Sequence, residues 1–227
     1  MGKIIYANIN KINFGLYDIE SIFSALPPKE LEKYEKFRFE ADKKRQLAGK
    51  ILLFTLLTEI GTEPESVDGL FEYNSRGKLF LPDLDCDFNI SHAGDYAACG
   101  IIESGRIGID IERKRDVHIS EVGDIVFNEA EIDFLNAQNP DKVLDAFYRL
   151  WSSKEAYCKA LGTGISGNIK DIYIDISGDN PLLRAACLED TARWQFLSFS
   201  DIPGYSFEVC CEKGARDNGD IEFAEFI

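Results

Sequence analysis

The sequence predicts an α+β fold of two similar lobes, packed as a pseudo-twofold pseudodimer. Both halves of the 227-residue chain run from a long helix to several strands, although no residue-level repeat is visible. Hydrophobic residues make up 45% and charged residues 29% of the chain, as in ordinary globular proteins. No low-complexity linker separates the halves. Each lobe is therefore expected to pack its long helix against a small antiparallel sheet.

The first lobe is expected to span residues 1–105. Hydrophobic periodicity and the stop signal of Gly61 place its helices, and the Ala93-Gly94-Asp95 turn places a hairpin. The expected elements are, in order, a strand in "IIYANINKI", helices over 28–39 and 42–60, short strands over 70–73 and 79–81, and paired strands in "FNIS" and "YAACGII".

The second lobe is expected to span residues 106–227. Asn139 and Pro140 supply N-cap and first-turn signals for a long helix that ends at Gly162. The tail after Gly214 is acidic and is expected to be loosely held. The remaining expected elements are a strand in "IGIDIE", helices over 120–126 and 129–136, and strands in "DIYIDIS", "RWQFLSFS" and "YSFEVCCE".

Composition and charge narrow the class of protein. A net charge of −15 argues against a nucleic-acid binder, and no apolar run is long enough for a membrane span. The six cysteines form no CxxC pair, and the N-terminus lacks the shape of a signal peptide, so a reducing, cytoplasmic location is expected. Residues 29–50 carry eight basic side chains against five acidic ones. This segment is either a small-anion site or a solvated helix pair.

The stretch "IGIDIE" carries the first chemical pattern. In a strand, Gly108, Asp110 and Glu112 point to one face, and the glycine is expected to leave room for a ligand. If Glu155 of the long helix faces the same place, three carboxylates converge there. They would need a cation to remain ionised together, and an all-oxygen set selects Mg²⁺ or Mn²⁺. Considered alone, the strand reads equally as an amphipathic strand with an acidic outer face.

A second pattern is "FNISHAGDY", in which Ser91 and His92 arrive at a strand end beside a glycine turn. Such a pair suits an oxyanion or phosphate cradle, although a single histidine is also a common structural residue. No "GxSxG" motif is present, so a serine-hydrolase triad is not indicated.

The long helix "LWSSKEAYCKALG" carries the third pattern. Glu155 and Lys159 are four residues apart, so one side of the helix presents a carboxylate for a metal and an ammonium group for phosphate. Lys154 falls within the apolar stripe instead. Its stem is expected to pack against Leu150 and Trp151, with its head paired to a buried carboxylate or to backbone carbonyls.

Together, "FNISHAGDYAACGI", "IGIDIE" and "LWSSKEAYCKALGTGIS" resemble the signature blocks of the 4′-phosphopantetheinyl transferases. The resemblance covers most of the chain and is closest to the two-lobed class that activates nonribosomal peptide and polyketide synthetases. It implies a Mg²⁺-dependent enzyme that moves the phosphopantetheine arm of coenzyme A to a serine of an acyl or peptidyl carrier protein. Adenosine 3′,5′-bisphosphate is released in that reaction.

The same resemblance implies roles for the residues of the second lobe. Asp110, Glu112 and Glu155 look like the magnesium ligands, and Mn²⁺ is an alternative ion. Glu155 also matches the general base for the carrier serine. Lys159 resembles the lysine that contacts the pyrophosphate of coenzyme A and assists the leaving group.

In the first lobe, the resemblance implies contacts to coenzyme A. Ser91 and His92 match a phosphate-contacting pair, and His92 is expected to add a contact to the reacting oxygens. Positions that hold the adenosine end and the 3′-phosphate in the family correspond to Lys33, Arg45 and Lys78, with Lys29 as a looser match. In this sequence Leu79 follows Lys78, where many relatives have proline.

The resemblance further implies a monomer with one active site between its own lobes, carrier-protein and coenzyme A partners, and neither nucleic-acid nor membrane partners. Two other functions are compatible with the residues: a Mg²⁺-dependent nucleotide or pyrophosphate hydrolase, and a non-catalytic coenzyme A-binding homologue. The pathway served, whether fatty-acid, polyketide or peptide synthesis, and the use of acylated coenzyme A do not follow from the sequence.

Overall fold

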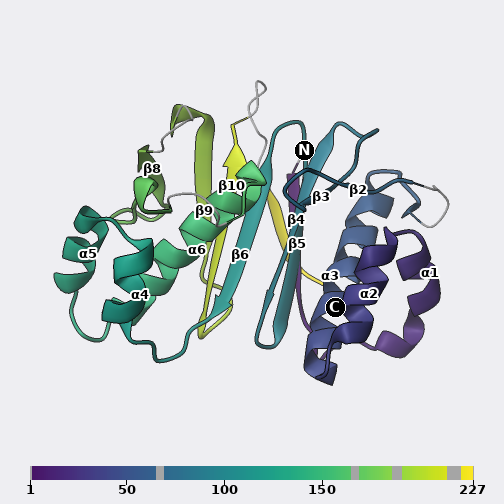
Figure 1. Cartoon of the computed structure of the whole chain (residues 1–227), viewed down its shortest axis with the longest axis horizontal. Helices are drawn as coiled ribbons and strands as arrows, with labels where there is room; N and C mark the ends of the chain where they lie inside the picture. The colour runs from purple at the N-terminus through teal and green to yellow at the C-terminus, as the bar shows by residue number, and fades with distance from the viewer. Residues whose placement is uncertain (1, 65–68, 165–168, 186–190, 214–220, 227) are drawn as a thin grey trace. The chain divides into compact units, whose positions relative to one another are not determined.

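The computed structural model describes residues 2–64, 69–164, 169–185, 191–213 and 221–226 (Figure 1). The chain divides into two compact units. The first unit contains residues 1–106 and 216–227, and the second contains residues 107–215.

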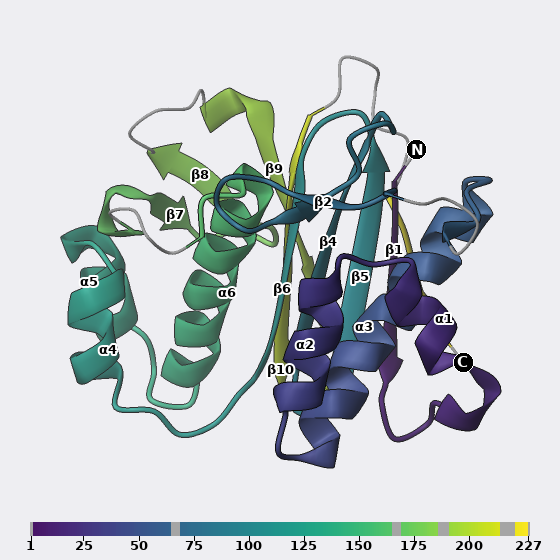
Figure 2. The same ribbon diagram turned by 45° about the vertical axis from the view of Figure 1, so that its right-hand side comes forward.

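The first unit is a mainly antiparallel sheet covered by helices, with one parallel pair at its edge. Its elements are β1 (Gly2–Asn8), a 3₁₀ turn (Phe14–Leu16), α1 (Ile19–Ser24), α2 (Pro28–Lys36), α3 (Glu40–Glu59), β2 (Glu72–Tyr73), β3 (Leu79–Phe80), β4 (Cys86–Ala93), β5 (Tyr96–Glu103) and β11 (Glu222–Glu225). The main sheet has the strand order β11-β1-β5-β4, and β2 pairs with β3. Figure 2 shows α2 lying against α3, which covers the sheet.

The last strand corrects two expectations about the C-terminus. β11 pairs in parallel with β1, so the second lobe does not extend to residue 227. Residues 222–225 are therefore not a loose tail, because they complete the edge of the first sheet and Ala224 packs against its core. The rest of the predicted tail, residues 214–220 and 227, lies outside the described residues.

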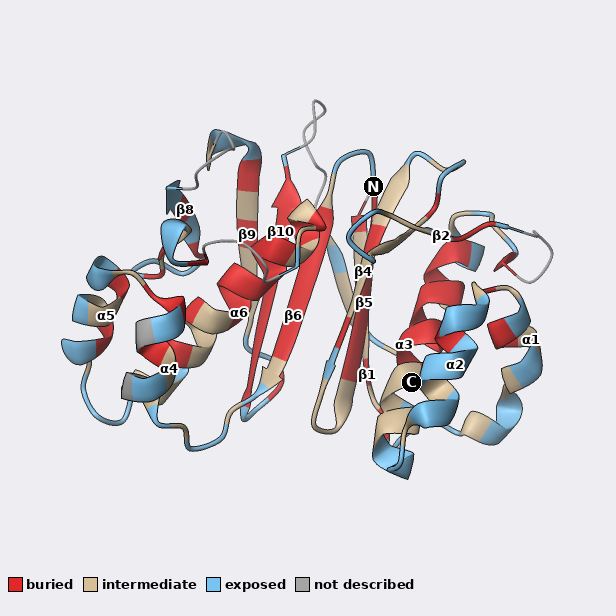
Figure 3. Ribbon diagram, in the orientation of Figure 1, coloured by how far each residue is buried: buried red, intermediate tan, exposed pale blue. Residues whose placement is uncertain are grey.

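Helix α3 owes its place on the sheet to a long apolar run. Ten of its twenty residues are buried, and Figure 3 shows the contrast with α2, which is mostly exposed. Gly49 lies at the contact, where a Cβ atom would come within 2.7 Å of Ile90 Cγ2 on β4. The glycine therefore lets the helix approach the strand closely.

The second unit repeats this plan. Its elements are β6 (Ile107–Arg113), α4 (Ile119–Val126), α5 (Glu129–Asn136), α6 (Val143–Leu161), a 3₁₀ turn (Ile169–Asp171), β7 (Tyr173–Asp175), β8 (Leu182–Ala185), a second 3₁₀ turn (Thr191–Arg193), β9 (Trp194–Phe199) and β10 (Tyr205–Glu212). Its main sheet has the order β6-β10-β9, and β7 pairs with β8.

The two units share one chain order. In each, a first strand is followed by helices, a two-stranded ribbon and a hairpin, and the last hairpin strand pairs with the first strand. This repeat confirms the predicted α+β class with two similar lobes, each with a long helix against an antiparallel sheet.

Helix α6 differs from its prediction at one end. It ends at Leu161 with Gly162 in the left-handed conformation (φ 66°), as the sequence predicts. Its beginning is later than expected, however, because residues 139–142 form a turn in which Lys142 N donates to Asn139 O at 2.8 Å. The helix begins at Val143, and its N-cap residue Lys142 makes no side-chain cap.

Two global expectations can be checked in the described residues. None of the helices there is both long enough and apolar enough to span a membrane. Five of the six cysteines are described and all five are free thiols, four of them buried. Cys187 lies outside the described residues.

Candidate active site

The site in the second unit lies where α6 covers the face of β6 that carries Asp110 and Glu112. A Cβ atom on Gly108 would lie 1.9 Å from the carbonyl oxygen of Ala156, so this strand face is in backbone contact with α6. Residues 110 and 112 share that face, because side chains alternate along a strand. The expectation that Gly108 leaves room for a ligand is wrong, since the helix backbone occupies that room.

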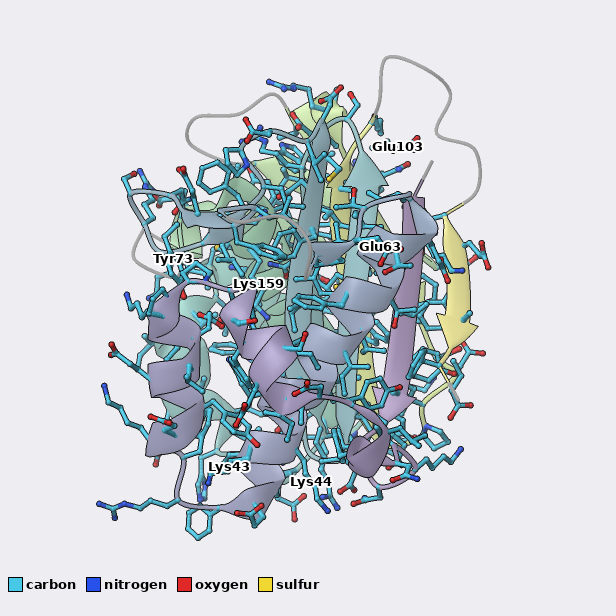
Figure 4. The ribbon with its side chains drawn as sticks, turned by 90° about the vertical axis from the view of Figure 1, so that its right-hand side faces the viewer. Lys43, Lys44, Glu63, Tyr73, Glu103 and Lys159 are labelled. Carbon is cyan, nitrogen blue, oxygen red and sulfur yellow. The ribbon has the colours of Figure 1, made fainter. Side chains whose placement is uncertain are left out.

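Lys159, in the last turn of α6 and labelled in Figure 4, faces the same strand. Its Nζ atom lies 2.6 Å from Asp110 Oδ1. The aspartate is buried, whereas the lysine side chain keeps 28% of its surface exposed. The ammonium group thus compensates a buried carboxylate, while the lysine side chain as a whole is partly exposed.

The charges of Asp110 and Lys159 also act on the carboxylates of Glu112 and Glu155. Burial, followed by the negative charge of Asp110, raises the pKa of Glu112 to about 7, with a smaller contribution from Glu155. Burial and Asp110 likewise raise the pKa of Glu155, against the opposing effect of Lys159. Like charges at close range in a poorly solvated place disfavour each other's ionised form. Asp110, Glu112 and Glu155 therefore lie close enough for their charges to influence one another, and their role as one metal site stays a prediction.

The donor set suits a hard cation in type. All three side chains offer carboxylate oxygens, and Glu155 Oε1 is buried with no hydrogen-bond partner among the described residues. As the side chains stand, however, the described residues contain no group of three or more His, Cys, Asp or Glu that could hold a metal ion. Lys159 offsets the negative charge of Asp110.

Lys154 has the partners that the sequence predicts for its head. Its side chain has no exposed surface, and its Nζ atom lies 2.5 Å from Glu131 Oε2. The same atom donates to the carbonyl oxygens of Val126 (3.0 Å) and Ile169 (3.1 Å). Burial raises the pKa of Glu131 and lowers that of Lys154, and the attraction between the two opposes both shifts.

A buried glutamate that the sequence analysis missed lies beside the site. Glu208 of β10 is the cross-strand partner of Asp110, and it is 3% exposed. It accepts a hydrogen bond from Ser198 Oγ at 2.6 Å, and Arg149 Nε lies 3.8 Å away. Burial raises the pKa of Glu208 to about 8. The sequence signal that could have indicated this residue is a single charge within the apolar run "YSFEVCC".

Arg149 and Glu208 also line a cavity of about 660 Å³ in the second unit. Arg149 donates to the carbonyl oxygens of Ile176 and Asp179 as well as to Ser198 Oγ. The guanidinium is therefore held by several acceptors, and it shields Glu208 at the wall of the cavity.

The basic residues expected in the first unit lie on α2, on α3 and just before β3. Lys33 on α2 pairs with Glu30 (2.7 Å), and Lys78 before β3 pairs with Asp87 (2.6 Å). Lys29 lies one turn before Lys33 on α2.

Arg45 on α3 supports the turn that follows Ser91 and His92. It pairs with Asp42 and donates to Gly94 O at 2.7 Å. Ser91 is buried and His92 is exposed at the end of β4, as expected for neighbours on a strand. They reach the predicted strand end beside the Gly94 turn, but they face opposite sides of the sheet.

The residues predicted to form one site are thus brought together in groups. The second unit assembles Asp110, Glu112, Glu155 and Lys159. The first unit brings Lys29 and Lys33 to one tyrosine ring, that of Tyr73. In addition, it places Arg45 at the turn after His92.

Sequence comparisons add an independent finding. A profile of the 4′-phosphopantetheinyl transferase superfamily matches residues 106–210. A second profile, described as 4′-phosphopantetheinyl transferase, N-terminal, matches residues 16–101.

Individual relatives agree with these profiles. The 4′-phosphopantetheinyl transferase Sfp of Bacillus subtilis is 31% identical over 84% of this chain and 84% of its own length. The 4′-phosphopantetheinyl transferase HetI of Nostoc is 30% identical over 79% of this chain and 75% of its own. A solved holo-(acyl-carrier-protein) synthase of Bacillus anthracis, in complex with CoA (3′,5′-ADP), is 21% identical, with a TM-score of 0.40 over 47% of this chain and 94% of that one.

Proposed function

The chain belongs to the 4′-phosphopantetheinyl transferase superfamily, and from this premise we propose that it transfers the phosphopantetheine arm of coenzyme A to a serine of a carrier protein. One observation of the site carries the proposal: Lys159, whose side chain is partly exposed, pairs with Asp110 and acts electrostatically on the buried carboxylate of Glu155. Phosphoryl transfer needs both a group that accepts the proton of the nucleophile and a cation for the charge of the leaving group.

In the proposed reaction, the serine oxygen forms a bond to the phosphorus that carries the pantetheine arm. The bond between this phosphorus and the bridging oxygen breaks, and adenosine 3′,5′-bisphosphate leaves. Glu155 accepts the serine proton, directly or through a water molecule. Lys159 offsets the negative charge that develops on the leaving group.

The metal ligands in this proposal are Asp110, Glu112 and Glu155, with Mg²⁺ as the ion. Their oxygen donors, the buried Glu155 Oε1 and the mutual effect on their pKa values support this choice. When bound, such an ion would stabilise negative charge on phosphate oxygens.

The first unit would bind the rest of coenzyme A. We assign phosphate contacts to Ser91 and His92, and contacts with the adenosine end to Lys33, Arg45 and Lys78, with Lys29 beside them. Support comes from the positive charge of Lys29 and Lys33 and from the exposure of His92 at its strand end. The expected monomeric state and cytoplasmic location stay predictions.

The test is to incubate the protein with coenzyme A, Mg²⁺ and an unmodified carrier domain and to weigh the carrier by mass spectrometry. The proposal expects a mass gain of one phosphopantetheine arm. Free bisphosphate without a change in the carrier would indicate a hydrolase instead. Neither product, with coenzyme A bound, would indicate a non-catalytic binder.

Two variants test the site itself. Asp110→Ala and Glu155→Gln should fold and lose at least about 100-fold in transfer rate, since each removes a charge-bearing group from the site. Asp145→Asn is the matched control, because it removes an exposed carboxylate from the beginning of the same helix. Wild-type turnover by Glu155→Gln with Mg²⁺ as the only metal would contradict the assigned roles.

A further inference from the structure

A glutamate is the only fully buried residue of α2. Glu30 is 3% exposed, and its two carboxylate oxygens receive four side-chain donors. Lys50 Nζ lies 2.6 Å from Oε2, which also accepts from Gln46 Nε2 at 3.2 Å. Oε1 accepts from Lys33 Nζ at 2.7 Å and from the hydroxyl of Tyr73. Glu30 therefore joins α2, α3 and β2 at one point.

The balance of charge at this point favours a fixed, ionised glutamate. Burial by itself would raise the pKa of Glu30, but Lys50, Lys33 and Tyr73 together lower it to about 2. Lys50 is itself buried and cannot reach a ligand. The charges of Glu30 and Lys50 therefore cancel inside the unit, and Lys33 keeps its positive charge for the surface.

The ring of Tyr73 gathers two ammonium groups at that surface. Lys29 Nζ lies 5.2 Å and Lys33 Nζ 5.3 Å from the ring centroid, within the range of cation–π contacts. In Figure 4, Tyr73 lies beside the N-terminal end of α2. The ring can hold both lysines because its hydroxyl is itself tied to Glu30.

Two like charges on one ring repel each other unless an anion compensates them. Among the described residues, Lys29 has no carboxylate within ion-pairing distance, and the protein as a whole is strongly acidic. A phosphate monoester carries close to two negative charges at neutral pH and several acceptor oxygens, so it matches two lysines. A phosphodiester or a neutral ribose hydroxyl does not.

We propose that Tyr73 and Glu30 are positioning residues that hold Lys29 and Lys33 together as a subsite selective for a phosphate monoester. This inference rests on the proposed function, in which the monoester is the 3′-phosphate of coenzyme A. Tyr73 then sets how strongly the enzyme prefers coenzyme A over its 3′-dephospho form, without touching the reacting atoms.

The kinetic test compares coenzyme A with 3′-dephospho-coenzyme A as substrates of the full chain. Tyr73→Leu removes both the ring and the hydroxyl. We expect the ratio of kcat/KM values for the two substrates to fall about tenfold, the effect of one weakened charged contact. The change should lie in KM for coenzyme A, with kcat for the 3′-dephospho form unchanged. Tyr73→Phe keeps the ring but removes its hydrogen bond to Glu30, so it should lose part of the preference, less than Tyr73→Leu.

A binding test does not depend on transfer. Adenosine 3′,5′-bisphosphate and adenosine 5′-monophosphate differ in the 3′-phosphate, and the ratio of their Kd values should fall about tenfold in Tyr73→Leu. If the wild type prefers the bisphosphate but modifies no carrier, the proposed function fails while the positioning role stands. No preference in the wild type, or an equal loss for both nucleotides in the variant, would overturn the positioning role.

Matched variants keep the test decisive. Lys43 lies 5.7 Å above the ring of Tyr34 in the same unit, so Lys43→Gln removes a similar cation–π contact that has no link to Glu30. It should leave both ratios unchanged. If Tyr73→Leu does not fold, Lys29→Gln and Lys33→Gln replace it. Each should lower the preference for the 3′-phosphate about tenfold, and an unchanged preference in both would refute the subsite.

Discussion

The two units each contain one buried lysine–glutamate pair, and the difference between the pairs shows what each unit does with it. In the first unit, Lys50 of α3 pairs with Glu30 of α2; in the second, Lys154 of α6 pairs with Glu131 of α5. Both lysines come from the long helix and both glutamates from the helix before it. The remaining partners differ.

In the first pair, the other partners are side chains. Glu30 also binds Lys33 and Tyr73, so the pair organises groups that reach the surface. In the second pair, the other partners belong to the backbone. Glu131 accepts from Ile174 N (2.9 Å), and Lys154 donates to two carbonyl oxygens.

The buried lysine–glutamate pair thus has a different role in each unit. The first pair supports side chains of the proposed coenzyme A subsite, whereas the second fixes α6 against the elements around it. Because Glu155 follows Lys154 directly, the second pair also sets the direction of the proposed general base.

Removal of the lysine should lower the free energy of unfolding more in the second pair than in the first. Lys154→Met leaves Glu131 without a cation and two carbonyl oxygens without their donor, so a loss of about 3–5 kcal/mol is expected. Lys50→Met leaves Glu30 with Lys33, Tyr73 and Gln46, and about 1–3 kcal/mol is expected. Chemical denaturation, followed by tryptophan fluorescence for the second unit and by circular dichroism, measures both.

Both tryptophans, Trp151 and Trp194, lie in the second unit, so their fluorescence reports its unfolding. Equal losses in the two variants would show that backbone and side-chain partners contribute alike. The double variant Lys154→Met with Glu131→Leu should recover part of the loss, because no buried charge remains unpaired.

The next largest difference in stability is expected between alanine variants of the two glycines at the helix–sheet contacts, Gly108 and Gly49. Gly108→Ala would place a Cβ atom 1.9 Å from a backbone oxygen of α6, so the helix must move and about 3 kcal/mol or more should be lost. Gly49→Ala meets only the side chain of Ile90, and its better helix propensity offsets part of the cost. Its net change should stay within about 1 kcal/mol.

Thermal unfolding and transfer activity should both be measured for the two glycine variants. Gly108→Ala should also lower activity, because α6 carries Glu155 and Lys159, whereas Gly49→Ala should not. A Gly108→Ala protein with wild-type stability would mean that the contact between β6 and α6 is looser than the structure shows.

The last difference concerns acid pH. A carboxyl group whose pKa is lower in the folded chain stabilises the fold above its unfolded value, and this contribution disappears as the pH falls to its folded value. For Glu30 the window runs from 4.5 down to about 2. The stability difference between wild type and Glu30→Gln should therefore be full at pH 7 and shrink within this window.

Denaturation midpoints of the first unit at several pH values, followed by circular dichroism, test this trend. Glu32→Gln is the control, because Glu32 is an exposed glutamate of the same helix and its variant should differ little from wild type at any pH. A Glu30→Gln difference that grows toward acid pH would contradict the assigned cause.

Local patterns predicted most elements and failed where distant segments decide the outcome. Periodicity placed both long helices, and Gly162 marked the end of α6. The predicted helix start at Asn139 and Pro140 was wrong because a turn can use the same residues as a helix start. Gly108 misled because a strand pattern does not tell which element packs on the glycine. No local signal indicated that residues 222–225 pair with β1.

Periodicity and short motifs were enough to predict the class of fold, the repeated lobes, the family and the chemical types in the site. The pairing of Lys159 with Asp110, the pairing of Lys154 with Glu131, and the contacts of Glu30 with Lys50 and Tyr73 are visible only in the folded chain. Burial explains this difference: a charge removed from water must find a partner, and that partner comes from residues that the fold, rather than the chain, makes neighbours.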